Sequence, residues 1–401
     1  MCVTHASECV RASQLIFRLN TPMSASTTWM DWVGFACGAA VVIGTSASII
    51  GALVVPRRVD SIVTGVVDKV LDKLFLLILK PVRAYDVRDQ VLGWQAPIAL
   101  VARLTVWMTM LVFGYVLLML PMANGNWGQA VNDAGSSVFT LGFSVPQSAG
   151  GHLITYIAGF TGMVVVGLQV GYLPTIYSEF NRRETEVSLL VARSGLPAWG
   201  AEILVRTHWG TDGGEIAPVL SDLFIRWERW TAEVAESHTT YPALLRLRSP
   251  RVNAHWLTSL VAVMDAAALH LALAPTTEPK IEARLVLRMG FETLNQIAQV
   301  LKLTVPERIL AGQPVPPDVA ISVTYEDFAE AAQQLRDVGY PVEISTEDAW
   351  PHFRGWRINY DVAALALCRN LDAPPSMWTG SRRWHSEPLR PFRPAPGLRR
   401  T

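Results

Sequence analysis

The chain of 401 residues is 50% hydrophobic and 17% charged, which is too apolar for an ordinary soluble pair of domains and too charged for a chain embedded wholly in a membrane. Lys plus Arg equals Asp plus Glu at 34 each, and no basic domain is present, so nucleic acid is not an expected partner. The cysteines (Cys2, Cys9, Cys37 and Cys368) lack CxxC or Cys/His spacing, so we expect no disulfide framework, no metal site and no cofactor.

The first expected element is a membrane-spanning helix at residues 32–55. The run 33–55, VGFACGAAVVIGTSASIIGALVV, holds no charge over about 23 residues, enough to cross a hydrocarbon core of roughly 30 Å. A cleaved signal peptide is the alternative, but the run starts late and is followed by Pro56, Arg57 and Arg58 without a cleavage site. Residues 1–31 are then an N-terminal extracytoplasmic segment.

Residues 56–97 are predicted to be an amphipathic linker. Apolar side chains recur at three- and four-residue spacing between residues 59 and 78, with charged residues such as Asp68, Lys69, Asp72 and Lys73 between them. Two placements fit this pattern. The helix packs against its own protein, or it lies in the inner membrane interface with its lysines towards anionic lipid.

Two further charge-free runs, 104–122 and 153–177, predict two more spanning helices. The segment between them, 123–152, holds no Lys or Arg, whereas 56–97 holds seven, and Arg182 and Arg183 follow the third run. The positive-inside rule then places the N-terminus outside, 56–97 inside, 123–152 outside and everything after 178 inside. We therefore expect a multi-pass protein of the cell membrane, with its C-terminal domain cytoplasmic.

The outer segment is longer than a turn requires. Its sequence WGQAVNDAGSSVFTLGFSVP predicts a short helix followed by an apolar, threonine, glycine and aromatic string. Non-helical backbone at membrane depth is tolerated only where protein buries it or water lines it, so we predict a re-entrant loop over 127–146. The partially negative C-terminus of the short helix would favour a cation in the cavity that it faces.

A helix, a re-entrant loop and a helix with TLGF at the turn resemble the pore module of potassium channels. The filter of that family is Thr-Val-Gly-Tyr-Gly, whose backbone carbonyls replace the water around an ion. The resemblance covers 98–180 and implies that Thr140, Leu141, Gly142 and Phe143 line a filter for potassium or another monovalent cation. It also implies a homotetramer, because one chain supplies one of four loops. A chance tetrapeptide in an outer loop is the competing interpretation.

The third helix suits a pore-lining role in such a module. Gly162, Gly167 and Gly171 could act as flexible points, and Pro174 could bend the cytoplasmic end. The match ends at Ser144, where the family has a glycine in a left-handed conformation. Serine in that conformation would carry roughly 1–2 kcal/mol of strain, so a less selective cation pore, or a relic that does not conduct, are the alternatives to potassium selectivity.

Residues 181–370 are predicted to be a helical cytoplasmic domain, after a continuation of the third helix to Gly195. Helices are expected at 215–237, 252–274, 281–303 and 327–338, and YPVEIS, residues 340–345, allows a short strand. Asp265, in an apolar helix, needs a partner, for which Arg284 or Arg288 would serve, and His270 fits a core histidine. Residues 371–401, rich in Pro and Arg, are predicted to be a disordered basic tail that could touch anionic lipid.

The segments WERW, ESHTTYP and LVAVMDAAALHLAL resemble the cytoplasmic part of bacterial membrane proteins described as potassium-channel-like. We therefore predict an all-α membrane protein with three transmembrane helices and a re-entrant pore loop, conducting cations passively and without enzymatic activity. The alternative function is a non-conducting scaffold or sensor that acts through its cytoplasmic domain. A third interpretation is a membrane-anchored enzyme built around Glu236, His238 and Asp265.

Overall fold

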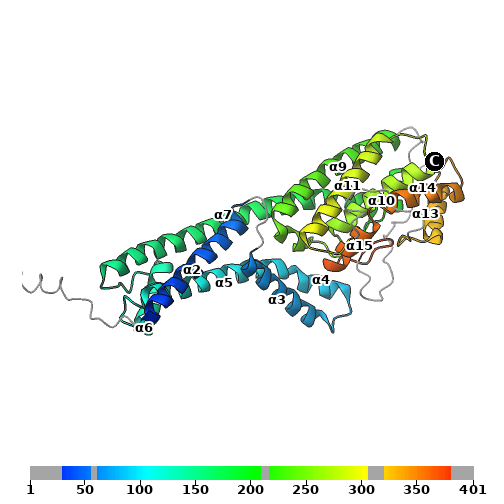
Figure 1. Cartoon of the computed structure of the whole chain (residues 1–401). Coiled ribbons are helices and arrows are strands. Elements are labelled where there is room, and N and C mark those ends of the chain that lie inside the picture. The colour runs from blue at the N-terminus through cyan, green and yellow to red at the C-terminus, as the bar shows by residue number, and fades with distance from the viewer. Residues whose placement is uncertain (1–28, 56–60, 209–215, 306–319, 381–401) are drawn as a thin grey trace, which may run out of the picture. The chain divides into compact units, whose positions relative to one another are not determined.

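The computed structural model describes residues 29–55, 61–208, 216–305 and 320–380, so most of the expected segment 1–31 and of the expected tail lies outside the described residues. Every regular element in the described ranges is a helix (Figure 1). The chain forms two compact units. Residues 1–54 with 104–169 make the first unit, and residues 55–103 with 170–401 make the second.

Within the described residues, four helical stretches are long and apolar enough to cross a membrane. They are Asp31–Leu53, Tyr85–Met119, Ala149–Ser194 and Trp256–Leu273. The first three contain most of each run predicted to span (33–53, 104–119 and 153–177), so the expectation of several apolar helices in an all-helical chain is confirmed. The fourth is different because all of its residues are buried against other helices of the second unit, which leaves none of its surface for lipid.

The first unit holds α2 (Trp29–Leu53), the apolar part of α5 (Gln95–Met119), α6 (Trp127–Val138) and the start of α7 (Ala149–Ser194). α2 and α5 cross at two glycines. A Cβ atom on Gly38 would lie 2.7 Å from the backbone oxygen of Gly114, so only glycine permits this approach. Ten residues further along α2, the buried indole nitrogen of Trp107 donates to Ser48 Oγ at 3.1 Å.

The second unit holds the amphipathic helix α3 and the helical domain. Its elements are α3 (Ile62–Leu79), α4 (Tyr85–Gly93), α8 (Gly200–His208), α9 (Ile216–Thr240), η2 (Pro242–Arg246), α10 (Trp256–Leu273), α11 (Ile281–Val300), α13 (Tyr325–Asp337), α14 (Thr346–Arg357) and α15 (Asp361–Asn370). α9, α10, α11 and α13 occupy the ranges in which helices were expected. α10 lies at the centre and contacts α8, α9, α11, α14 and α15.

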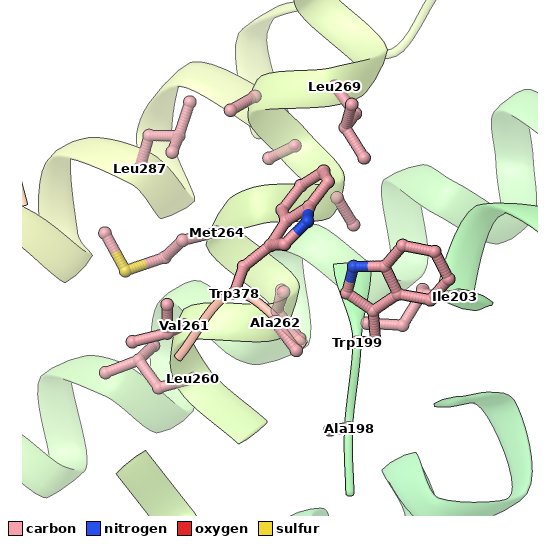
Figure 2. Close-up of a cluster of buried hydrophobic side chains, with 14 of the residues drawn as sticks. Ala198, Trp199, Ile203, Leu260, Val261, Ala262, Met264, Leu269, Leu287 and Trp378 are labelled. Carbon is pink, nitrogen blue, oxygen red and sulfur yellow. The ribbon is translucent and has the colours of Figure 1, made fainter. Parts of the chain in front are cut away.

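Two tryptophans pack beside α10 and close the core of the second unit. Trp199 and Trp378 meet edge to face, with ring centroids 5.7 Å apart, and Figure 2 shows both indoles next to Ala262 and Ile203. Gly200 permits this arrangement, because a Cβ atom there would lie 2.7 Å from the backbone nitrogen of Ala266. The C-terminal loop that carries Trp378 is thereby fixed to a segment almost 180 residues earlier in the chain.

Two expectations for this unit are wrong. Residues 340–345 form no strand, because their amides bond to helix ends, with Tyr340 N donating to Leu335 O and Glu343 N to Leu273 O. Asp265 is buried as expected, but its partners are Arg357 and Tyr360.

Arg284 and Arg288 lie on the exposed side of α11. The face of α11 that packs towards α10 is made of small and apolar residues such as Val286 and Gly290, so neither arginine can reach Asp265. His270 is buried, as a core histidine should be, and its Nδ1 shares a hydrogen bond of 2.7 Å with Tyr340 Oη.

A buried polar network joins α4 to the end of the helical domain. Arg88, which is 1% exposed, bonds Asp372 at 2.5 Å and donates to Leu79 O at 2.9 Å. Arg248 bonds Asp89 at 3.1 Å and donates to Leu371 O at 2.7 Å. The helix that precedes α5 is therefore held by residues far away in the sequence.

Candidate functional site

The candidate site is the short helix α6 with the non-helical segment after it, and both belong to the first unit. Asn126 caps α6, since its side-chain oxygen accepts a hydrogen bond from Gln129 N at 3.2 Å. Ala130, Ala134 and Val138 follow at four-residue spacing and are all buried. The helix predicted at this place is thus present, and a helix of twelve residues is too short to cross a bilayer.

The C-terminal end of α6 is seated directly on α7. A Cβ atom on Gly162 would lie 1.9 Å from the carbonyl oxygen of Val138, and one on Gly159 would lie 3.5 Å from that of Ser137. Gly162 was expected to be a flexible point, but its missing side chain serves this close approach. A hydrogen bond of 2.8 Å between Tyr115 Oη and Thr161 Oγ1 joins α5 to α7 nearby.

α6 ends in a left-handed turn at the predicted filter. Thr140 N donates to Ser137 O at 3.0 Å and Leu141 N donates to Ser136 O at 2.8 Å, the two bonds of a Schellman motif. Thr140 occupies the position where glycine is usual, with φ of +55°, and Gly142 follows with φ of +75°. A β-branched residue in this region is rare and costs about 1–2 kcal/mol, so the turn is strained at Thr140.

The two faces of this turn differ in their hydrogen bonding. The amides of residues 139–142 all donate back to carbonyls of α6, including Gly142 N to Ser136 O at 3.4 Å. The carbonyl oxygens of residues 140–143 accept no hydrogen bond from any residue that the structure describes. The amides of the loop are thus bonded to the helix, whereas these four carbonyl oxygens have no donor among the described residues.

Ser144 is anchored to α6. Its amide donates to Ser136 Oγ at 3.1 Å, and its hydroxyl donates to a carboxylate oxygen of Asp133 at 2.5 Å. Ser144 does not take a positive φ, so the strain expected of serine at this position is absent. Its side chain supplies a bond that glycine could not make.

Asp133 is a buried charged residue beside the loop that the sequence analysis did not single out. It is 2% exposed, and it is the only Asp, Glu, Lys or Arg between residues 104 and 178. A lone carboxylate in so long an apolar stretch is costly unless it has a partner and a purpose. That isolation was the available signal, and Ser144 Oγ is the partner.

The apolar side chains of the loop are uncovered in a single chain. Leu141 is 66% exposed, Phe143 is 65% exposed and Phe139 is 52% exposed. On α7, a Cβ atom at Gly167 or Gly171 would meet nothing within 4 Å, and Pro174, also exposed, lies inside the helix. Large apolar side chains gathered at one loop need lipid or another protein surface against them.

The residues of the enzyme interpretation do not form one site. Glu236 is exposed, whereas His238 is fully buried, with Nε2 3.1 Å from Arg183 and Nδ1 3.0 Å from Ser237. Burial, and then the nearby charge of Arg183, hold the pKa of His238 well below its ordinary value of 6.5. Asp265 has its own buried partners. In the described ranges, no group of three or more His, Cys, Asp and Glu residues could hold a metal ion.

Comparison of the chain with protein-family models, with curated proteins and with solved structures returned no match.

Proposed function

We propose that the chain is a three-span membrane protein with a re-entrant loop, and that four copies surround this loop to form a passive cation pore. The spanning segments are α2, the apolar part of α5 and the apolar part of α7. α10 belongs to the helical domain, because its whole surface is covered by protein. The observation that carries the proposal is that the carbonyl oxygens of residues 140–143 accept no hydrogen bond from any described residue.

Free carbonyl oxygens at membrane depth need a partner, because an unpaired backbone group costs several kcal/mol in hydrocarbon. A cation supplies that partner, and carbonyl rings are the usual ligands of potassium filters. The electrostatic potential at the loop is negative, which also favours a cation. The loop follows the partially negative end of α6, and the carboxylate of Asp133 lies behind it within reach of Ser144.

Four-fold assembly is proposed because one chain contributes a single loop, which cannot surround an ion. Assembly would also cover the exposed side chains of Leu141 and Phe143. Since the backbone at Ser144 is not left-handed, the left-handed glycine that ends a potassium filter is not reproduced there. We therefore propose a pore for monovalent cations that discriminates weakly between potassium and sodium.

The test is ion flux through the full-length protein reconstituted in liposomes, with potassium, sodium and chloride measured separately. Gly142→Asp should abolish flux. Gly125→Asp is the matched control, because Gly125 has a φ of +76° against +75° for Gly142 and both have open space at the Cβ position. Both variants therefore impose the same backbone strain, and only one places it in the proposed filter.

A third variant tests whether the negative charge of Asp133 favours cations. Asp133→Asn keeps an oxygen that can accept from the Ser144 hydroxyl but removes the negative charge, so preference for cations over chloride should fall while the protein stays folded. Equal flux in the wild type and in Gly142→Asp would reject the pore. A mass of one or two chains in mild detergent, together with absent flux, would instead favour the scaffold or sensor.

A further inference from the structure

The amphipathic helix α3 leaves a continuous apolar stripe uncovered. Val66, Val70, Leu74 and Leu77 recur at four- and three-residue spacing, and their exposed fractions are 53%, 58%, 48% and 67%. Ile62, at the start of the same stripe, is 85% exposed. A soluble helix would not carry so many exposed branched side chains along one line.

The opposite side of α3 is packed and neutralised inside the second unit. Phe75 and Leu79 are buried against Leu92 of α4. Asp68 accepts two hydrogen bonds from one nitrogen of Arg103, at 2.6 and 2.7 Å. α3 therefore rests on α4 and on the first turns of α5.

The second acidic residue of α3 also faces inwards. Asp72 bonds Arg246 at 2.8 Å and accepts from Gln95 at 2.9 Å. Burial raises the pKa of this carboxyl above its usual range, although Arg246 opposes the shift. Both acidic residues of the helix thus have partners within the second unit.

The outward charges of α3 are consequently all positive. Lys69, Lys73 and Lys80 are exposed, and their spacings of four and seven residues place them in one row along the edge of the apolar stripe. A positive row beside an apolar row is the pattern of a helix that lies in a membrane interface.

We propose that α3 docks on the bilayer itself, with the apolar stripe immersed at the headgroup boundary and the three lysines against anionic lipid phosphates. This inference rests on the spanning helices of the proposed function and does not require conduction. The position in the chain supports a lipid partner. Arg103, which holds α3, immediately precedes the charge-free run that starts at Leu104, so α3 is tied to the end of a spanning segment. A bilayer offers apolar depth and negative charge side by side, which matches both rows.

The experiment is a spin-label accessibility measurement on the full chain in vesicles. Single cysteines at Val70 and Leu77 are labelled in a background without native cysteine. Matched controls are cysteines at Ile225 of α9 and Leu285 of α11, which are also apolar and are 48% and 43% exposed. Collisions with molecular oxygen report lipid, and collisions with a neutral nickel chelate report water.

In vesicles that contain phosphatidylglycerol, the two α3 labels should be oxygen-accessible at a depth of roughly 5–10 Å, whereas both control labels should be chelate-accessible. Phosphatidylcholine alone should reduce that depth. Replacing Lys69, Lys73 and Lys80 together by glutamine should reduce it to the same extent and abolish the dependence on lipid charge.

Two results would overturn the proposal. Labels on α3 that remain chelate-accessible in anionic vesicles would show a water-exposed helix. Labels that are shielded from both reagents and show spin–spin broadening would show that a second copy covers the stripe. Neither readout uses flux, so a failure of lipid docking and a failure of the proposed pore remain distinguishable.

Discussion

Gly162→Ala should damage the site although no new charge or polar group is introduced. The added methyl would lie 1.9 Å from the carbonyl oxygen of Val138 and 2.9 Å from its carbonyl carbon. Both atoms are backbone, so no side-chain rotation relieves the overlap. Separations below 3.0 Å are essentially never seen for real Cβ atoms, and α6 must therefore move away from α7 by about 1 Å.

The expected cost of this movement is about 1–3 kcal/mol, the range for overpacking a tight contact. The functional effect should be larger than the loss of stability suggests. The carbonyl of Val138 belongs to the last turn of α6, and the same turn supplies Ser136 and Ser137 to hold the loop. Displacing it by 1 Å moves the free carbonyls with it, and a misplacement of this size is enough to spoil ion ligation.

The assay compares Gly162→Ala with Gly34→Ala on α2. The methyl at Gly34 meets nothing within 4 Å, so that variant should keep its flux and gain up to about 1 kcal/mol from helix propensity. Flux in liposomes and unfolding in mixed micelles are measured for both. If the two variants behave alike in both measurements, α6 does not pack on α7 at this point and the argument for the loop geometry fails.

Three further predictions concern packing and charge elsewhere. Gly38→Val should destabilise the first unit by about 1–3 kcal/mol in micelle unfolding, whereas Gly44→Val, with open space at Cβ, should not. Arg357→Met should cost roughly 3–5 kcal/mol in denaturant unfolding because it leaves the buried Asp265 carboxylate without its positive partner, and adding Asp265→Leu should recover much of the loss; no recovery would mean the pair is not the source. As pH falls below 6.5, the unfolded chain binds a proton that buried His238 refuses, so stability should fall by up to about 1.4 kcal/mol per pH unit; an unchanged slope in His238→Gln would contradict this.

The helical elements were accessible from the sequence because their signals are local. A run without charge must satisfy its own backbone in lipid, which only a helix does within one segment. α10 shows the limit of that rule, since its composition alone also suits a membrane. Asp265 and His270 within it indicated a core helix instead, and the structure buries both.

Contact partners that are distant in the sequence could not be predicted from local signals. Asp265 was paired with an arginine on the next predicted helix, yet its partner Arg357 lies 92 residues away. Helical spacing predicts which face of a helix is buried, but it does not say which remote element covers that face. On α11, helical spacing places Val286 on the inward side, and it places Arg284 and Arg288 on the outward side, away from Asp265.

At the loop, aligning the sequence with the filter motif located the segment but put the backbone strain at the wrong residue. Serine in place of glycine suggested a strained Ser144, whereas the helix end decides the backbone and puts the left-handed residue at Thr140. The hydrogen bond from Ser144 to Asp133 joins residues 11 positions apart, and neither residue type by itself predicts it. Only the isolation of Asp133 in an uncharged stretch pointed to its importance.

The contact between Arg88 and Asp372 can form only near the end of synthesis of the chain. Arg88 is 1% exposed when complete, and its carboxylate partner is synthesised 284 residues later. At about 5–20 residues per second, roughly 15–60 s separate the two. During that interval the run at 104–122 has already been synthesised, while the carboxylate that binds Arg88 of α4 is still missing. All residues of the first unit, which ends at residue 169, are therefore synthesised before the carboxylate that completes this contact of the second unit, and a chain truncated before Asp372 lacks the negative charge that balances Arg88.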